Sequence, residues 1–190
     1  RFSEAANRLK IPLVWIEDVW GAHTRSKASP QLVLCFDEIG EKIIGRKTDR
    51  FAKTRTEVVG DFGLENMKNL AKIPAEIKQE VYRLKQTFKY LVCLAGQGPF
   101  TSDMIVLLKD SLTQTQESCA VISRLHPKYK GTEHMARWQE LLNSFPANTV
   151  VDVPGASSDQ LAVLCDITWS TFGTGMRYAA HYENIVGSVL

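Results

Sequence analysis

The chain has 190 residues, 44% of them hydrophobic, which suits one ordinary domain or two small ones. Lysine and arginine number 23 against 21 aspartates and glutamates, so the formal net charge is only +2. This balance argues against a nucleic-acid-binding protein, and it predicts that any anion site is local rather than a broad basic surface.

No apolar run reaches the ~18 residues of a transmembrane helix, and no signal-peptide pattern is present. We therefore expect a cytoplasmic protein, and the sequence leaves peripheral attachment to a membrane open. The cysteines occur singly inside apolar runs, which predicts buried thiols rather than disulfides or a metal site. They are Cys35, Cys93, Cys119 and Cys165.

Helical and strand patterns alternate through the first part of the chain. Residues 2–10 show the spacing of an amphipathic helix, and branched and aromatic residues mark strands elsewhere. The further predicted elements are strands at 11–16, 29–36 and 55–61 and a helix at 37–45. A longer helix is predicted over 71–88, with Pro74 in its first turn.

From residue 89 the alternation is strict, and the strands are nearly continuous apolar runs. Strands are predicted at 89–95, 119–125, 148–153, 166–170 and 184–189. Helices are predicted between them at 103–114, 132–145, 159–165 and 176–182. Repeated strand–helix units with apolar strands predict an α/β protein with Rossmann-like parallel sheets and helices on both faces.

We place a domain boundary in the glycine-containing turn and polar stretch near residues 61–72. The predicted organisation is an amino-terminal Rossmann-like part over 1–66, a linker helix over 67–88 and a nucleotide-binding Rossmann-like domain over 89–190.

Three loops of the last domain follow strand ends, so they are expected on one edge of the parallel sheet, where such folds bind ligands. Glycines let backbone N–H groups approach an anion, and hydroxyl and cationic side chains add donors. The predicted nucleotide- or phosphate-binding residues are Gly96, Gln97, Gly98, Arg124, His126, Lys128, Ser170, Thr171 and Thr174.

A plainer interpretation of each loop stands beside this one. The glycines suit tight turns, a His-Pro pair is common in loops, and Ser170 or Thr174 could cap the next helix. The sequence lacks the complete dinucleotide-binding fingerprint and the Walker loop, which argues against an ordinary dehydrogenase or ATPase. His134 and His181 fall within predicted helices and are expected to be structural.

In the first part of the chain, carboxylates and a histidine follow the strand at 11–16. Glu17, Asp18 and His23 are the candidate catalytic residues, because such groups at a strand end can act as a general base or acid. The alternative is a solvated loop whose charges pair with one another. No metal site is predicted.

Over its whole length the chain resembles the glycosyltransferase-B superfamily. The stretch "LKIPLVWIEDVWGAHTRS" resembles the loop of non-hydrolysing UDP-N-acetylglucosamine 2-epimerases in which a strand runs into a "VEAG-R" pattern, with Glu17, Gly21 and Arg25 as matches at altered spacing. "EVVGDFGLENM" resembles the turn that closes the amino-terminal domain, with Asp61 in place of the usual asparagine.

"RLHPKY" and "DITWSTFGTGMRYAAHYENIV" resemble the His-Pro and serine motifs of bacterial sialyltransferases and of capsule and teichoic-acid transferases. The resemblance implies that His126, Ser170 and Thr171 contact the donor nucleotide. The acidic residue that usually follows the serine motif is replaced here by the run 176–179. The resemblance also implies that the amino-terminal domain is incomplete in this chain.

The resulting hypothesis is a nucleotide-sugar-dependent glycosyltransferase, or a glycerophosphate transferase, in surface polysaccharide or glycoconjugate synthesis. It would use a nucleotide-sugar as donor substrate, a glycan or lipid-linked acceptor, and no cofactor. Two alternatives stay open: a UDP-sugar 2-epimerase, and a non-catalytic Rossmann-like domain that binds a partner or a sugar phosphate. Whether this chain is an active enzyme, and its oligomeric state, are not decided by the sequence.

Overall fold

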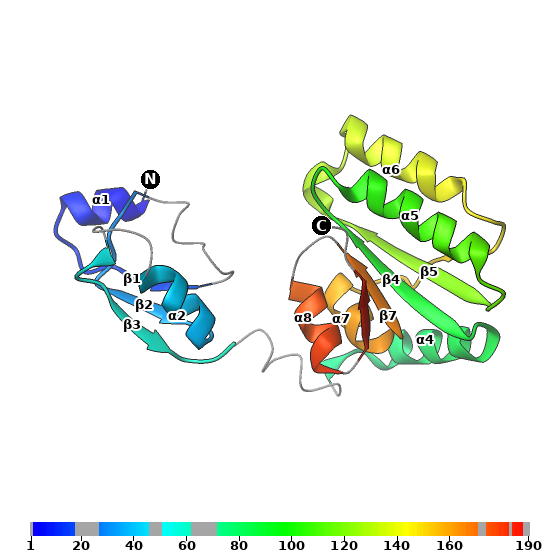
Figure 1. The fold of residues 1–190 in the computed structure, drawn as a ribbon, viewed down its shortest axis with the longest axis horizontal. Coiled ribbons are helices and arrows are strands. Elements are labelled where there is room, and N and C mark those ends of the chain that lie inside the picture. The colour runs from blue at the N-terminus through cyan, green and yellow to red at the C-terminus, as the bar shows by residue number, and fades with distance from the viewer. Residues whose placement is uncertain are drawn as a thin grey trace. The chain divides into compact units, whose positions relative to one another are not determined.

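The structure is a computed structural model that describes residues 2–17, 27–45, 51–61, 72–170, 174–182 and 184–187. The chain divides into two compact units, residues 1–66 and residues 67–190. Figure 1 shows the helices and strands of both, and each unit is described by itself.

The first unit contains a three-stranded parallel sheet in the order β1-β2-β3. Its elements are α1 (Phe2–Arg8), β1 (Val14–Ile16), β2 (Leu32–Cys35), α2 (Glu38–Gly45) and β3 (Arg55–Val58). Val33 and Cys35 of β2 pack with Ile44 of α2 and with Phe51, and Trp15 lies against this cluster. Since side chains alternate along a strand, Val14 and Ile16 point to the other face, where both are exposed.

The second unit contains a five-stranded parallel sheet in the order β6-β5-β4-β7-β8. Its strands are β4 (Tyr90–Gly96), β5 (Cys119–Leu125), β6 (Val150–Val151), β7 (Ile167–Ser170) and β8 (Ile185–Gly187). Its helices are α4 (Ala75–Thr87), α5 (Thr101–Gln114), the 3₁₀ helix η4 (Pro127–Tyr129), α6 (Glu133–Asn143), α7 (Ser158–Leu164) and α8 (Thr174–His181).

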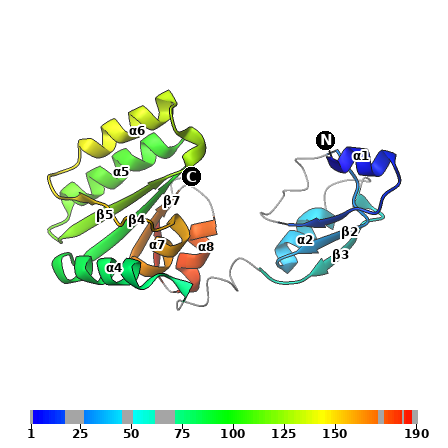
Figure 2. The ribbon, with the colours of Figure 1, turned by 180° about the vertical axis from the view of Figure 1, so that it is seen from behind.

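Helices cover both faces of this second sheet, with α5 and α6 on one face and α4, α7 and α8 on the other (Figures 1 and 2). On the first face Val92 and Leu94 of β4 pack with Met104 of α5 and Trp138 of α6. On the other face the Cys93 thiol and the Thr168 hydroxyl lie against carbonyls of α7. The central strand β4 is therefore almost fully enclosed, which explains its continuous apolar sequence.

The predicted α/β fold with parallel sheets is confirmed, and most elements lie where the sequence patterns put them. The Thr132 hydroxyl accepts a hydrogen bond from the Met135 N–H at 3.4 Å, so it caps α6 as expected. Several elements are shorter than predicted, among them β1, β2 and β3 of the first unit. In the second unit Pro74 has extended backbone angles and precedes α4, which begins only at Ala75, and β6 is reduced to Val150–Val151.

Asp166 joins three elements of the second unit at the amino-terminal side of the sheet. Its carboxylate accepts from the Lys85 ammonium of α4 at 2.7 Å and from the Leu91 N–H of β4 at 2.8 Å. Its own N–H donates to the Leu91 carbonyl, and its carbonyl accepts from Ile185.

We expect Asp166→Ala to lower the free energy of unfolding by about 1–2 kcal/mol, because the N–H of the buried Leu91 loses its side-chain acceptor. Asp166→Asn keeps an oxygen for that N–H and loses only an exposed ion pair, so it should cost less than about 1 kcal/mol. Urea unfolding followed by tryptophan fluorescence compares the two. Equal losses in both variants would show that the ion pair, not the backbone contact, carries the effect.

Candidate nucleotide-binding site

The strand order of the second sheet creates a switch point between β4 and β7. From β4 the chain moves outward through β5 and β6, then returns to the opposite side of β4 to form β7 and β8. Gly96 of β4 pairs with Leu125 of β5, and Ala95 pairs with Ser170 of β7. Loops that leave neighbouring strands in opposite directions leave a crevice between them, which is where open α/β sheets bind ligands. We call the edge formed by the ends of β4, β5 and β7 the carboxyl edge.

The β4–α5 loop contains the predicted Gly96, Gln97 and Gly98. A Cβ atom at position 96 would lie 2.7 Å from side-chain carbons of both Leu125 and Thr101, so glycine is needed there for close packing. Gly98 has a φ angle of +84°, which favours glycine, and its carbonyl accepts from both the N–H and the hydroxyl of Thr101. The two glycines therefore form a tight turn that places the start of α5 at the carboxyl edge.

The amino-terminal end of α5 carries the positive end of the helix dipole. Asp103 is exposed in the first turn of this helix, and its carboxylate offsets part of that potential. A diphosphate at this edge would therefore need cationic or hydrogen-bonding side chains from a neighbouring loop.

His126 lies in that neighbouring loop, directly after β5. Its N–H donates to the Gly96 carbonyl at 2.8 Å, which ties the two loops together. The imidazole is exposed, and its Nδ1 atom accepts from the Lys128 N–H at 3.2 Å and so caps η4. In the neutral ring this leaves the proton on Nε2, so His126 can offer an N–H to a ligand without becoming charged.

Aromatic side chains support the His126 loop. The Tyr129 ring meets the rings of His126, His134 and Trp138 edge-on, with centroid distances of 6.5, 5.9 and 4.8 Å. The Lys128 ammonium lies over the Tyr129 ring at 4.9 Å from its centroid. These contacts anchor the loop to the buried Trp138 of α6 and leave an exposed cation beside His126.

The side chain of Arg124 makes hydrogen bonds within the protein that the sequence pattern does not indicate. Its guanidinium donates to the carbonyls of Ser123, Val153 and Ala156 and to the Asp152 carboxylate. Three of these hydrogen bonds hold the loop between β6 and α7 against β5, and the fourth, to Ser123, lies within β5. The phosphate-binding role predicted for Arg124 would compete with these bonds.

The serine motif begins at Ser170, the last residue of β7. Its buried hydroxyl donates to the Ala95 carbonyl of β4 at 2.9 Å, directly at the switch point. Thr171 and the side chain of Thr174 lie outside the described residues, and α8 begins at Thr174. Within the described part of the site, Gly98, His126 and Ser170 thus come from three chain segments that meet at the carboxyl edge.

Of the candidate catalytic residues, the structure describes only Glu17, and Asp18 and His23 lie outside the described residues. Glu17 directly follows β1 and is 8% exposed, with its carboxylate packed against Gly40 of α2, where a Cβ atom would collide with it. Burial, followed by the negative charge of Glu17, raises the pKa of the nearby Cys35 thiol to about 11.

Three cysteines, Cys35, Cys93 and Cys165, are buried as predicted, whereas Cys119 is partly exposed. Burial raises the pKa of the Cys93 thiol to about 12, so this thiol is protonated at neutral pH and is a poor nucleophile. Within the described residues no group of three or more potential ligands is placed to hold a metal ion. No described helix combines the length and the apolar character that crossing a bilayer requires.

Comparison with solved structures places this arrangement among known folds. HepE from Anabaena, in complex with UDP and glucose, is 16% identical with a TM-score of 0.62, over 98% of this chain and 55% of that chain. The MnaA–UDP structure from S. aureus is 11% identical with a TM-score of 0.66, over 97% and 53% of the two chains. UDP-N-acetylglucosamine 2-epimerase from Rickettsia bellii is 15% identical with a TM-score of 0.67, over 97% and 51%.

The likeness establishes the fold. This chain has the Rossmann-like α/β architecture of glycosyltransferase-B-like proteins, and it spans about half the length of the structures it matches. The sequence matches no protein-family model and no curated protein. The comparison therefore shows the fold alone and selects no family.

The sequence analysis missed two residues of the carboxyl edge, Phe100 and Tyr129. Phe100 is exposed at the start of α5, and Tyr129 is the centre of the aromatic contacts behind His126. Both are ordinary aromatic residues in loops, and only the tertiary contacts distinguish them. A phenylalanine directly after the Gly98–Pro99 pair is the one signal that the sequence carried.

We expect Arg124→Lys to lower the free energy of unfolding by about 1–3 kcal/mol, because an ammonium cannot reach the same set of carbonyls. Arg137→Lys is a matched control, since Arg137 makes an exposed ion pair with Glu140 one turn away and should change stability by less than about 0.5 kcal/mol. Urea unfolding measures both. A stable Arg124→Lys variant with weakened nucleotide binding would instead assign the guanidinium to the ligand.

Proposed function

We propose that the second unit binds the diphosphate of a nucleotide sugar at the carboxyl edge, and that the protein is a nucleotide-sugar-dependent glycosyltransferase or glycerophosphate transferase. The observation that carries this proposal is the placement of His126 and Gly98 on two joined loops beside the switch point. HepE, which shares the fold, was solved with UDP and glucose and also with UDP-glucose. Surface polysaccharide or glycoconjugate synthesis, with a glycan or lipid-linked acceptor, is the proposed setting.

In this proposal the protein acts by stabilising the negative charge that develops on the leaving nucleotide phosphate. The His126 Nε2–H, the Lys128 ammonium and backbone N–H groups near Gly98 would face the diphosphate, and Ser170 would hold the switch point in shape. Thr171 and Thr174 would add hydroxyl donors. Glu17, Asp18 and His23 of the first unit stay sequence-based candidates for a general base, of which Glu17 is buried, and the proposal invokes no cofactor.

Calorimetric titration with UDP, CDP and CMP tests the proposal directly. We expect one of these nucleotides to bind the full chain with a dissociation constant below the millimolar range. Failure of all three to bind at millimolar concentration would overturn the proposal and favour the non-catalytic alternative, a Rossmann-like domain that binds a partner or a sugar phosphate.

The two nitrogen atoms of His126 allow its capping and binding roles to be separated. His126→Ala removes both, whereas His126→Asn keeps an oxygen near the Nδ1 position that can accept from the Lys128 N–H. We expect both variants to lose about tenfold or more in nucleotide affinity, because the Nε2–H to the phosphate is gone. Only His126→Ala should also be less stable, by about 0.5–2 kcal/mol.

Calorimetry and urea unfolding on the same three proteins give both quantities. If His126→Asn binds the nucleotide as tightly as the wild type, His126 is a cap and not a ligand contact, and the donor site must lie elsewhere.

A UDP-sugar 2-epimerase is the second candidate, favoured by the structural likeness to the epimerases from Rickettsia bellii and Methanocaldococcus jannaschii. The two activities differ in what they need. An epimerase converts UDP-N-acetylglucosamine to its 2-epimer without an acceptor, whereas a transferase needs one. Proton NMR of the nucleotide sugar after incubation with the protein alone therefore separates the two, and appearance of the 2-epimer would replace the transferase proposal.

A further inference from the structure

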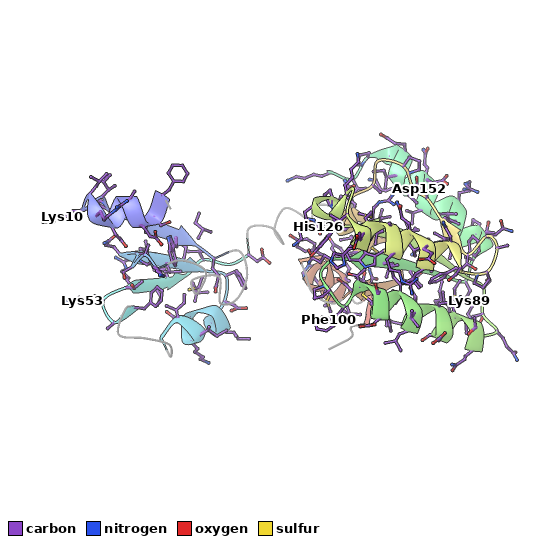
Figure 3. All side chains as sticks on the ribbon, turned by 90° about the horizontal axis from the view of Figure 1, so that it is seen from above. Lys10, Lys53, Lys89, Phe100, His126 and Asp152 are labelled. Atoms are coloured by element: carbon purple, nitrogen blue, oxygen red, sulfur yellow. The ribbon has the colours of Figure 1, made fainter. Side chains whose placement is uncertain are left out.

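Phe100 lies at the carboxyl edge with most of its surface exposed. Its side chain is 57% exposed, although phenylalanine is among the residues most often found in protein cores. It follows the Gly98 turn and immediately precedes α5. In Figure 3 Phe100 and His126 lie at one end of the second unit, and Lys89, which precedes β4, lies at the opposite end.

Several backbone features order the turn that carries Phe100. Gly98 turns with a positive φ angle, the ring of Pro99 fixes the φ angle of that proline, and the Phe100 carbonyl accepts from the Met104 N–H at 3.0 Å. Thr101, the next residue, is fully buried and bonded to Gly98. These contacts order the backbone that carries the ring, so less backbone entropy is lost when a ligand meets Phe100.

A general protein-binding patch explains this exposure less well. On α5 the exposed Leu107 lies on the same side of the helix two turns further, but the charged Asp103 lies between the two on that side. The Met104 side chain, which is the other neighbour of Phe100 along the helix, is fully buried. Among the described residues of α5, Phe100 is therefore not part of a continuous apolar stripe.

The position of Phe100 relative to the loop at Gly98 selects which part of a nucleotide sugar it can meet. The sugar is attached directly to the terminal phosphate, whereas the base is separated from that phosphate by the inner phosphate and the ribose. With the terminal phosphate at the Gly98 loop, as the proposed function has it, a ring two residues further along would lie nearer the sugar than the base. The face of an aromatic ring carries negative charge and attracts the polarised C–H groups on the apolar face of a pyranose.

We propose that Phe100 is a binding residue for the sugar of the nucleotide-sugar donor, with its ring against the C–H face of that sugar. The proposal rests on the proposed function, since it needs the diphosphate at the carboxyl edge. It adds a specificity element: the chain recognises the hexose through a rigid aromatic ring, in addition to polar groups.

The test compares UDP with UDP-glucose and UDP-N-acetylglucosamine by calorimetry, on the full chain and on Phe100→Ala. We expect Phe100→Ala to weaken binding of at least one of the two UDP-sugars by about three- to tenfold and to leave UDP affinity within about twofold. Phe100→Tyr keeps the ring and should restore sugar binding. Tyr82→Ala, which removes another exposed aromatic ring of the same unit from α4, should change neither affinity.

The outcomes distinguish this inference from the proposed function. If UDP binds the wild type and Phe100→Ala weakens UDP and UDP-sugars equally, the ring contacts the nucleotide and the sugar assignment is wrong. If Phe100→Ala changes no affinity, Phe100 is not a ligand contact, while the nucleotide site stands. If UDP and both UDP-sugars fail to bind the wild type, the uridine nucleotide site itself is absent and this inference falls with it.

Discussion

The enclosed position of β4 is the constraint on which the rest of the second unit depends. This strand pairs in parallel with β5 on one side and with β7 on the other, and helices cover both of its faces. Parallel pairing brings the carboxyl ends of all three strands to one edge, and the reversal of strand order around β4 opens the crevice there. Gly96 and Ala95 at the end of β4 consequently touch both neighbouring strands and position their loops.

Polar side chains at the carboxyl edge fall into two groups. Some make their hydrogen bonds within the protein, and others stay accessible to a ligand. The Arg124 guanidinium donates hydrogen bonds to the β6–α7 loop, and the Ser170 hydroxyl donates one to the Ala95 carbonyl. Buried donors and acceptors must be satisfied, so these side chains stabilise the edge itself. His126 and Lys128 differ because they are exposed and are held from behind by Tyr129. The distinction follows from burial and could not be read from residue type.

The near-neutral charge of the chain is consistent with recognition by a small, built site rather than by a basic surface. Two exposed side chains and a glycine turn at a helix start can meet a diphosphate without a large positive field. An outward aromatic ring on the same rigid turn would add contact with an attached sugar. The proposed site thus combines polar side chains, backbone N–H groups and an aromatic ring within two consecutive βα loops of the sheet.

The sequence by itself determined the fold class, because strand and helix periodicities are local properties and parallel strands require apolar runs. It also placed the loops at 96–98, 126–128 and 170 on one edge, since parallel topology makes every strand end there. The strand order, and with it the switch point beside β4, came only from the tertiary structure, because pairing between strands far apart in sequence leaves no local pattern. The roles of individual side chains were decided in the same way. Arg124 and His126 are two residues apart and look alike as candidates, but the fold surrounds the first with carbonyls and leaves the second in solvent.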